Sequence, residues 1–266
     1  MNRIPVYLVG AGPGAADLLT LRAARLLSQA DIVFYDALVQ PEVIALAEKA
    51  VKISVGKRCG KHSSAQRFIH KRLIDAAHAG QTVVRLKGGD PMLFGRAQEE
   101  IDALSQAGID VEIVPGVSAA FASSARLGIS LTRRGLARSV CFVTPRVGLH
   151  ESQSNNWIRA AMAADTCAMY MGAETVHAVV TALLEAGRAA HTACALIENA
   201  SCPNERVWFS SLIALPALVD HVQLTGPAII MMGEVYAHAQ TKKVRQSSTQ
   251  VEYVAPYAGL KRQWSA

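Results

Sequence analysis

The stretch VVRLKGGDPMLFG, residues 83 to 95, has the residue types needed to hold a small polar molecule. Gly88 and Gly89 have no side chains, so they can adopt positive φ and bring bare N–H groups against a ligand. Asp90 can accept hydrogen bonds from ribose hydroxyls or from an amine of that ligand. The alternative interpretation is a tight turn with an acid beside the following helix.

A second glycine-rich segment, GAGPG, follows the first apolar run of the chain. The spacing of Gly10, Gly12 and Ala15 fits the loose pattern of a dinucleotide-binding loop, and Asp36 stands about where the ribose-binding acid of such a site belongs. Pro13, however, removes one of the N–H donors that would hold a pyrophosphate. A nicotinamide oxidoreductase is therefore kept only as an alternative.

Two charged residues stand just beyond the GGDP turn. Arg96 and Glu99 are three residues apart, so on a helix they share one face close to the glycine loop. They could both face a ligand, or they could form a surface ion pair.

Alternating strands and helices are predicted to position these motifs. Apolar runs rich in β-branched residues each end in Gly, Pro or Asp and lead into apolar residues at helical spacing, which indicates an α/β fold with parallel strands. Strands are predicted at 6–9, 31–35, 51–55, 82–87 and 111–114. The loops after parallel strands meet at one edge of a sheet, so we expect the two glycine loops and Asp36 to lie there. Beyond a charged interruption at 132–138 the alternation repeats.

The composition is that of a globular chain with a large core. Of its 266 residues 51% are hydrophobic and 18% are charged. No apolar run approaches the roughly 18 residues of a membrane span, and MNRIPVYLVG leads into a strand without a signal-peptide pattern. The 5 cysteines are scattered along the chain and show no CxxC spacing. We therefore expect a cytoplasmic protein with no membrane contact, no disulfide framework and no metal.

The net charge of +6 comes from the N-terminal half and from the residues after 237. Between Lys49 and Arg72 there is no acid, and the loop GKRCGKH carries Lys57, Arg58 and Lys61. Such a patch suits a polyanionic partner. Few aromatic residues alternate with these charges, so a nucleic-acid partner is not expected.

Several segments occur in one order from Val6 to about Val235: VYLVGAGPG, VGKRCGKHSSAQ, VVRLKGGDPMLFGR, VPGVSAA, MYMG, LIENAS and GPAIIMMGEV. Together they resemble the S-adenosyl-L-methionine-dependent tetrapyrrole methyltransferases, and within that family the uroporphyrinogen-III C-methyltransferases. The resemblance implies two successive methylations of uroporphyrinogen III to precorrin-2, for sirohaem, cobalamin or haem d1 synthesis.

The same resemblance implies a fold and an assembly. We expect an α/β tetrapyrrole methylase fold of two domains, 1–135 and 136–240, followed by a polar, basic tail, 241–266. Each domain has a parallel or mixed sheet flanked by helices, with the cofactor in the cleft between the domains, and the chain forms a homodimer.

The resemblance also implies roles for particular residues. Asp36 and Lys57 match the proton acceptor and the proton donor, and Arg96 and Glu99 match positions that face the tetrapyrrole. A guanidinium stays protonated, so Arg96 is expected to bind a carboxylate instead of acting as a base. The implied contacts to S-adenosyl-L-methionine are Pro13, Gly88, Gly89, Asp90, Leu93, Ser118, Ala119, Met171 and Ala200.

The chain departs from the family pattern at three places. Ala97 and Gln98 replace two glycines after Arg96, Arg133 replaces a histidine, and Pro145 and Arg146 replace a Gly-His pair. We expect the larger side chains at 97 and 98 either to narrow the substrate cleft or to change how the ring sits. The changes at 133 and at 145 and 146 are expected to add positive charge and to stiffen a loop beside the tetrapyrrole.

Other functions stay open at this point. A later precorrin methyltransferase is the nearest one, and a methyltransferase for ribosomal RNA or a translation factor would also explain the basic patch. A non-catalytic tetrapyrrole or nucleotide carrier is a further alternative, against which the retained Asp36, Lys57, Arg96 and Glu99 argue. The oxidoreductase alternative needs a proton relay in the second half of the chain, where His177, His191 and His221 stand isolated.

Overall fold

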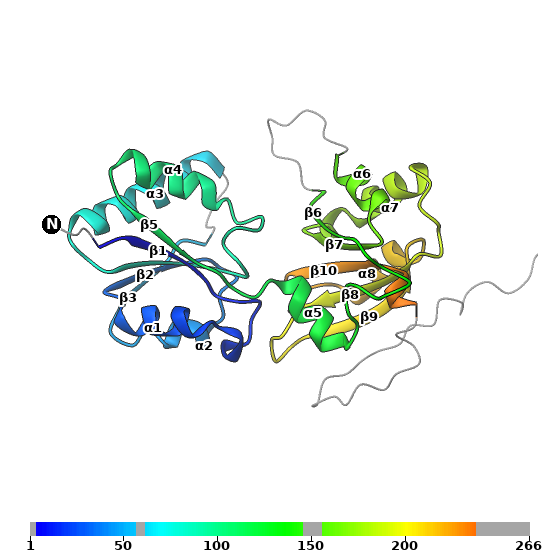
Figure 1. Cartoon of the computed structure of the whole chain (residues 1–266), viewed down its shortest axis with the longest axis horizontal. Coiled ribbons are helices and arrows are strands. Elements are labelled where there is room, and N and C mark those ends of the chain that lie inside the picture. The colour runs from blue at the N-terminus through cyan, green and yellow to red at the C-terminus, as the bar shows by residue number, and fades with distance from the viewer. Residues whose placement is uncertain (1–3, 57–61, 146–155, 238–266) are drawn as a thin grey trace, which may run out of the picture. The chain divides into compact units, whose positions relative to one another are not determined.

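The computed structural model describes residues 4–56, 62–145 and 156–237. By its internal contacts the chain divides into two compact units, Met1–Ala122 and Ser123–Ala266. Within the described residues each unit contains a five-stranded sheet with helices packed against it (Figure 1). The α/β class expected from the sequence is confirmed, while the domain limits at 135 and 240 stay a prediction.

The sheet of the first unit is wholly parallel, with the strand order β3-β2-β4-β1-β5. Because each strand is followed by a crossover that returns the chain to the same end of the sheet, the carboxyl ends of these strands share one edge, here called the carboxyl edge. The elements are β1 (Val6–Gly10), α1 (Leu21–Gln29), β2 (Ile32–Tyr35), α2 (Pro41–Ala45), β3 (Val51–Ser54), α3 (His62–His78), β4 (Val83–Lys87), α4 (Ala97–Gln106), β5 (Val111–Val114) and the start of α5 (Ala119–Leu127).

Helices cover both faces of this sheet, with α1 and α2 on one face and α3 and α4 on the other (Figure 1). The alternation of side chains along β4 follows from this arrangement. Val84 and Leu86 pack toward α1 and α2, whereas Val83 packs with Leu104 of α4. A strand buried on both faces would ordinarily be apolar throughout, yet β4 also contains Arg85 and Lys87, both buried.

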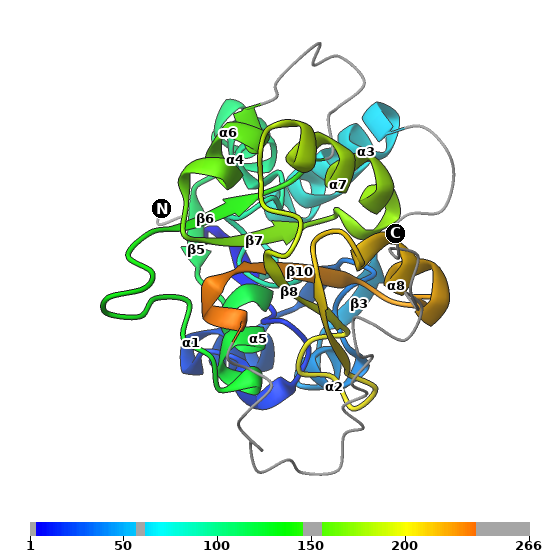
Figure 2. The ribbon, with the colours of Figure 1, turned by 90° about the vertical axis from the view of Figure 1, so that its right-hand side faces the viewer.

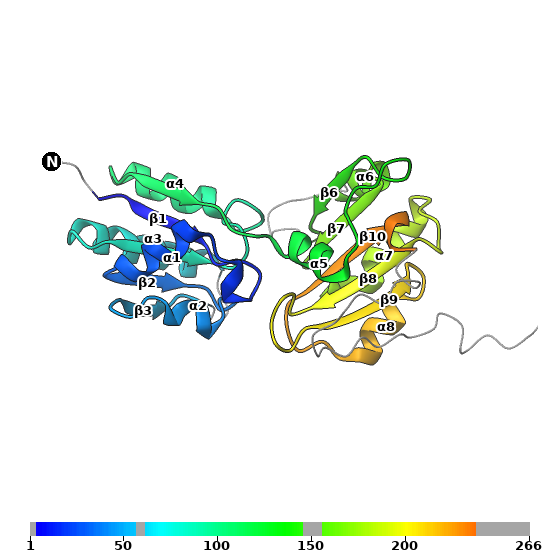
Figure 3. The same cartoon turned by 60° about the horizontal axis from the view of Figure 1, so that its bottom comes forward.

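The sheet of the second unit is mixed, with the order β6-β7-β10-β8-β9 (Figure 3). The β6–β7 pair is parallel, and β10 pairs antiparallel with both of its neighbours, as β8 does with β9. The elements are β6 (Val140–Val143), α6 (Asn156–Ala163), β7 (Thr166–Tyr170), α7 (Val176–Glu185), β8 (Ala193–Glu198), β9 (Arg206–Ser211), α8 (Leu215–Val222) and β10 (Ala228–Gly233).

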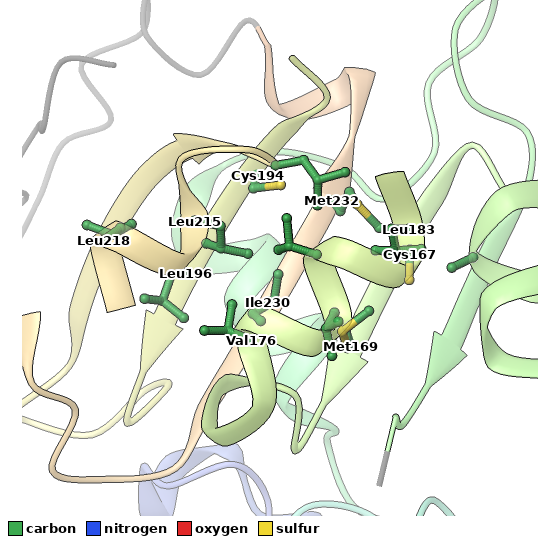
Figure 4. Packing of buried hydrophobic residues seen from close by; sticks show 14 of the residues in the cluster. Cys167, Met169, Val176, Leu183, Cys194, Leu196, Leu215, Leu218, Ile230 and Met232 are labelled. Atoms are coloured by element: carbon green, nitrogen blue, oxygen red, sulfur yellow. The ribbon is translucent and has the colours of Figure 1, made fainter. Parts of the chain in front are cut away.

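The core of the second unit lies between this sheet and the helices α6, α7 and α8 (Figures 2 and 4). Four of its residues form a row of sulfur atoms across adjacent strands: Cys141 pairs with Cys167, and Met232 pairs with both Cys167 and Cys194. These three cysteines are free thiols. Burial raises the pKa of the Cys194 thiol to about 12, so this side chain acts as a small apolar residue.

Three loops of the first unit meet as backbone against backbone at Gly10, Gly89 and Gly116, here called the glycine junction. A Cβ on Gly116 would lie 2.3 Å from the Gly89 carbonyl oxygen and 2.9 Å from the Gly10 Cα. The N–H of Gly12 donates to the carbonyl oxygen of Gly89 (3.2 Å), and the N–H of Gly89 donates to that of Gly12 (2.7 Å). The loops after β1, β4 and β5 are therefore fixed to one another at the carboxyl edge.

The glycine junction predicts that Gly116→Ala costs more than an ordinary glycine replacement. The added methyl group meets backbone atoms that cannot rotate away, so we expect a loss of about 3 kcal/mol or more in the free energy of unfolding, measured by urea denaturation. The control is Gly80→Ala in the same unit: Gly80 has φ +76° and no atom within 4 Å of an added Cβ. It should lose only about 1 to 2 kcal/mol from left-handed strain. Equal losses in the two variants would contradict the close approach.

Candidate functional site

The residues singled out from the sequence fall into two groups, one in each unit. Pro13, Asp36, the Gly88-Gly89-Asp90 turn, Leu93, Ser118 and Ala119 follow strands of the parallel sheet and lie at its carboxyl edge, as expected. Met171 and Ala200 follow β7 and β8 of the second unit. Because β7 and β8 both run antiparallel to β10, their carboxyl ends share one edge of the second sheet.

Asp90 joins two loops of the first unit. Its Oδ2 accepts a hydrogen bond from the N–H of Gly116 (2.9 Å), and its Oδ1 accepts one from the N–H of Met92 (2.8 Å). The carboxylate thus holds the loop after β4 against the loop after β5. Asp90 fixes the shape of the glycine turn before any ligand is considered.

Gly89 leaves its α-carbon open to a ligand, but its N–H and carbonyl groups are both paired with Gly12, so the expectation of a bare N–H at this residue is wrong. It has φ +68°, and an added Cβ would meet no atom within 4 Å, in contrast to Gly88, where it would lie 3.0 Å from Leu38 Cβ. The apolar side chains of Met92 and Phe94 are 53% and 38% exposed on the same loop. A small molecule with polar and apolar parts can therefore approach the turn from this open side.

Arg96 and Glu99 form a bidentate ion pair at the start of α4. The Nε and Nη2 of Arg96 each donate to one Glu99 oxygen at 2.6 Å. This hydrogen bonding raises the pKa of Arg96 and lowers the pKa of Glu99. About half of each side chain is exposed, so the pair itself adds little stability. The surface-pair alternative describes this geometry correctly, but the pair also stands where a ligand could reach it.

The backbone carries strain next to this pair. Phe94 and Arg96 both have φ 54°, a left-handed conformation that costs a residue with a side chain about 1 to 3 kcal/mol. Such conformations persist only where the surrounding structure enforces them, and they are found most often at active sites and ligand-binding loops. The sequence pattern alone did not indicate this strain.

Asp36 contacts a buried arginine. The Nη2 of Arg85 donates to Asp36 Oδ1 at 2.6 Å, and the Asp36 side chain stays 30% exposed. This contact and the position of α1 argue against the dinucleotide alternative. In a dinucleotide-binding site the glycine loop leads directly into a helix. In this chain α1 begins only at Leu21, after a 3-10 turn at Ala16–Leu18.

Behind Asp36 lies a buried charge network that the sequence analysis missed. Glu100 is 0% exposed and accepts hydrogen bonds from Arg85 Nε (3.1 Å) and Lys87 Nζ (3.1 Å). Burial and the neighbouring Arg85 lower the pKa of Lys87. Burial opposes the charged form of Arg85 as well, yet Asp36 and Glu100 raise its pKa overall. The sequence did contain a signal for this network. Arg85 and Lys87 are two residues apart in an otherwise apolar strand, so they lie on the same face of the sheet, and Glu100 is one helical turn before the apolar Leu104.

The second unit also has strained backbone where a ligand contact is predicted. Met171 has φ 55° and is 41% exposed at the end of β7. Ala200 lies between Asn199 (φ 51°) and Ser201 (φ 66°) in the loop after β8. The strained positions thus coincide in both units with loops that the resemblance assigns to the cofactor.

Buried carboxylates hold the Ala200 loop in place. Glu205, 4% exposed, accepts from the N–H of Ser201 (2.6 Å) and from Arg126 Nε (2.6 Å). Glu198, 0% exposed, accepts from Arg206 Nε (2.5 Å) and from the backbone N–H groups of residues 225 and 226. Burial alone would raise the pKa of Glu198, but these donors outweigh it and lower that pKa.

Some expectations about single residues need correction or lie outside the described residues. Lys57 and Arg146 are not among the described residues. The expectation that Ala97 narrows a cleft is wrong, because its side chain is 4% exposed and packs in the core beneath α4. Gln98 is exposed and donates to Asp102 Oδ1 (2.7 Å) along the helix.

The expectation that His177 stands isolated is also wrong, because its Nε2 lies 3.0 Å from Asp220 Oδ2. Both side chains are more than 60% exposed, at 67% and 62%, so the pair lies on the surface. Among the described residues no group of three His, Cys, Asp or Glu side chains could hold a metal ion. In the same part of the chain, no helix is both long and apolar enough to cross a membrane.

Comparison with known proteins identifies relatives over most of the chain. Residues 5–216 match the model of the tetrapyrrole (corrin/porphyrin) methylases. A sirohaem synthase of Pseudomonas putida is 45% identical over 232 residues, which are 86% of this chain and 50% of that protein. The chain thus spans about half the length of the curated relatives it matches.

Solved structures agree with this assignment. Uroporphyrin-III C-methyl transferase from Thermus thermophilus, in complex with S-adenyl homocysteine, is 39% identical with a TM-score of 0.75, covering 87% of this chain and 98% of that one. A cobalt precorrin-4 methyltransferase is 27% identical with a TM-score of 0.77, covering 88% of this chain and 96% of that one.

The Glu205 contacts predict a local effect of Glu205→Gln. A neutral amide can accept only one of the two hydrogen bonds and turns an N–H group toward a donor, so we expect a loss of roughly 1.5 to 3 kcal/mol in stability. Hydrogen exchange at the Ser201 amide should become faster, measured by NMR or mass spectrometry. The control Asp75→Asn breaks the exposed Lys71–Asp75 pair and should cost less than about 1 kcal/mol. Unchanged exchange at Ser201 would show that Glu205 does not hold this loop.

Proposed function

The chain belongs to the tetrapyrrole (corrin/porphyrin) methylase family, and we propose that it is an S-adenosyl-L-methionine-dependent C-methyltransferase. Its proposed reaction converts uroporphyrinogen III into precorrin-2 by two successive methyl transfers. The identity to the Thermus thermophilus enzyme and to the sirohaem synthases supports this substrate. The observation that carries the proposal is the open α-carbon face of Gly89, which lies at the same carboxyl edge as Asp36 and the Arg96–Glu99 pair.

The residues at the carboxyl edge fit S-adenosyl-L-methionine. Gly89 offers an open surface free of side chains, and the nearby exposed Met92 and Phe94 offer apolar surface. Pro13, Leu93, Ser118 and Ala119 would complete the contacts in this unit, and Met171 and Ala200 those in the second. When bound, the sulfonium supplies the methyl group as an electrophile.

Arg96 and Glu99 fit a polycarboxylate substrate. Uroporphyrinogen carries acetate and propionate groups around its rim, and a guanidinium binds carboxylates through paired N–H donors. Glu99 engages Nε and Nη2 of Arg96, so a substrate carboxylate would meet the Nη1 donors. Because Glu99 raises the pKa of Arg96, the side chain stays cationic and acts by binding and orientation.

Asp36 is the proposed proton acceptor. Each methyl cation added to a neutral ring system brings one positive charge, which the ring loses as a proton. The Asp36 carboxylate is partly exposed and held through Oδ1 by Arg85, so Oδ2 can receive that proton. The reaction is a displacement at the methyl carbon, for which alignment matters more than strong acid catalysis. Lys57 is kept as the proposed proton donor from the resemblance alone.

A later precorrin methyltransferase is the second candidate. The cobalt precorrin-4 methyltransferase superposes as well as the uroporphyrin enzyme does, with TM-scores of 0.77 and 0.75, so the fold does not separate the two. The sequence identities of 27% and 39% favour uroporphyrinogen III. A cytoplasmic location and a homodimer stay predictions.

Turnover of methyl-labelled S-adenosyl-L-methionine with uroporphyrinogen III under anaerobic conditions tests the proposal. We expect two labels in each macrocycle and the absorbance of precorrin-2 after oxidation. Precorrin-2 and later methylated precorrins in the same panel test the second candidate. Label only in a later precorrin would move the assignment to that class, and cofactor binding without transfer to any tetrapyrrole would contradict an enzyme of this family.

Arg96→Ala should nearly abolish methyl transfer. It removes charged hydrogen bonds of about 1.5 to 3 kcal/mol each, so kcat/KM should fall by roughly 100-fold or more. The matched control is Arg22→Ala, which breaks an exposed ion pair with Glu112 (3.3 Å) in the same unit and should leave kcat/KM unchanged. A normal rate in Arg96→Ala would exclude it from substrate binding.

A further inference from the structure

We propose that Arg85 and Glu100 are positioning residues, which fix Asp36 and the start of α4 relative to each other at the carboxyl edge. This inference rests on the proposed function. Neither residue touches the open face of the site, since Arg85 is 2% exposed and Glu100 is 0% exposed. They act through the residues they hold.

The guanidinium of Arg85 is held from several directions. Its Nη2 donates to Asp36 Oδ1 (2.6 Å) and its Nε to Glu100 Oε1 (3.1 Å). Its Nη1 donates to the backbone carbonyl oxygens of Phe34 (3.4 Å) and Leu86 (3.1 Å). A planar guanidinium that is hydrogen-bonded at all three nitrogens cannot rotate, so it holds the Asp36 carboxylate in one orientation. The same contacts join β4 to the end of β2.

Glu100 ties the first turn of α4 to β4. Its oxygens accept from Arg85, from Lys87 Nζ (3.1 Å) and from Gln66 Nε2 of α3 (3.4 Å). Glu99 is the preceding residue, so its direction is set once Glu100 is anchored. Glu99 in turn holds Arg96. Together with the buried Ala97 and Leu104, this carboxylate fixes the rotation of α4 and with it the direction of the proposed substrate-binding pair.

The composition of the network favours positioning over stability. Arg85 and Lys87 are cations and Asp36 and Glu100 are anions, so the group is neutral as a whole. Buried ion networks commonly stabilise a fold no more than apolar residues of the same size, because desolvation offsets their attraction. What they supply is direction, since hydrogen bonds require specified geometry. In this chain the groups that the network orients are the Asp36 carboxylate and the Arg96–Glu99 pair.

The test is Arg85→Lys, which keeps the charge but cannot contact both carboxylates and both carbonyl groups at once. We expect kcat to fall by roughly 10- to 100-fold, as small misplacements of reacting groups do, while KM for S-adenosyl-L-methionine changes little. The matched control is Leu104→Ala, a buried residue of the same helix that lies outside the network. It should lower the melting temperature and leave kcat nearly unchanged when both variants are assayed well below their melting temperatures.

A double-mutant cycle with Asp36→Asn shows whether Arg85 acts through Asp36. If it does, Arg85→Lys costs little further in the Asp36→Asn background, because the group it positions is already gone. Fully additive losses would overturn the inference, as would an unchanged kcat in Arg85→Lys or an equal loss of kcat in Leu104→Ala. Glu100→Gln serves as the second network variant should Arg85→Lys fold poorly.

The wild-type rate is measured first, so that failure of the proposed function is recognised separately. If the wild type transfers no methyl group to any tetrapyrrole in the panel, the proposed function fails. The positioning claim is then decided by crystal structures of the wild type and Arg85→Lys. A displaced Asp36 carboxylate or a rotated α4 supports it, and unchanged positions of both overturn it.

Discussion

A carboxylate that is fully buried needs cations within hydrogen-bonding distance, and in the first unit Glu100 is such a carboxylate. The two cations that pair with it come from β4, so a central strand of the sheet carries Arg85 and Lys87 between its apolar residues. Arg85 then has a second anion in Asp36. The direction of α4 and the end of β2 both follow from this one buried charge.

The second unit uses the same device at a different place. Glu198 and Glu205 are buried at the two ends of the loop after β8. Each accepts a hydrogen bond from an arginine, and Glu198 accepts two more from backbone N–H groups and Glu205 one more. Loops have few apolar side chains of their own with which to hold a shape. Buried carboxylates replace that missing core, and they allow Asn199 and Ser201 to keep left-handed backbone that would otherwise relax.

Much of this architecture could be predicted from the sequence, because Gly and Pro separate its apolar runs. The predicted strand 111–114 is β5 residue for residue, and the predicted loops of the first unit do meet at one edge. The strand order β6-β7-β10-β8-β9 could not be predicted, since a short apolar run does not reveal its direction. Side-chain contacts between residues far apart in the sequence were also missed, because local spacing does not show which distant segments meet. Arg85 and Asp36 are 49 residues apart, and His177 and Asp220 are 43 apart.

The glycine junction has a consequence for how this chain can vary. An enlarged residue in a packed core can often be accommodated when a neighbouring side chain becomes smaller. At Gly10 and Gly116 the neighbours are the Cα of the other glycine and the carbonyl oxygen of Gly89, which are present whatever residues are encoded there. No second substitution can make those atoms smaller. Intragenic suppressors of a change at either glycine should therefore be absent among the three junction positions, and a lineage that loses one of these glycines has to rebuild the loop or regain it.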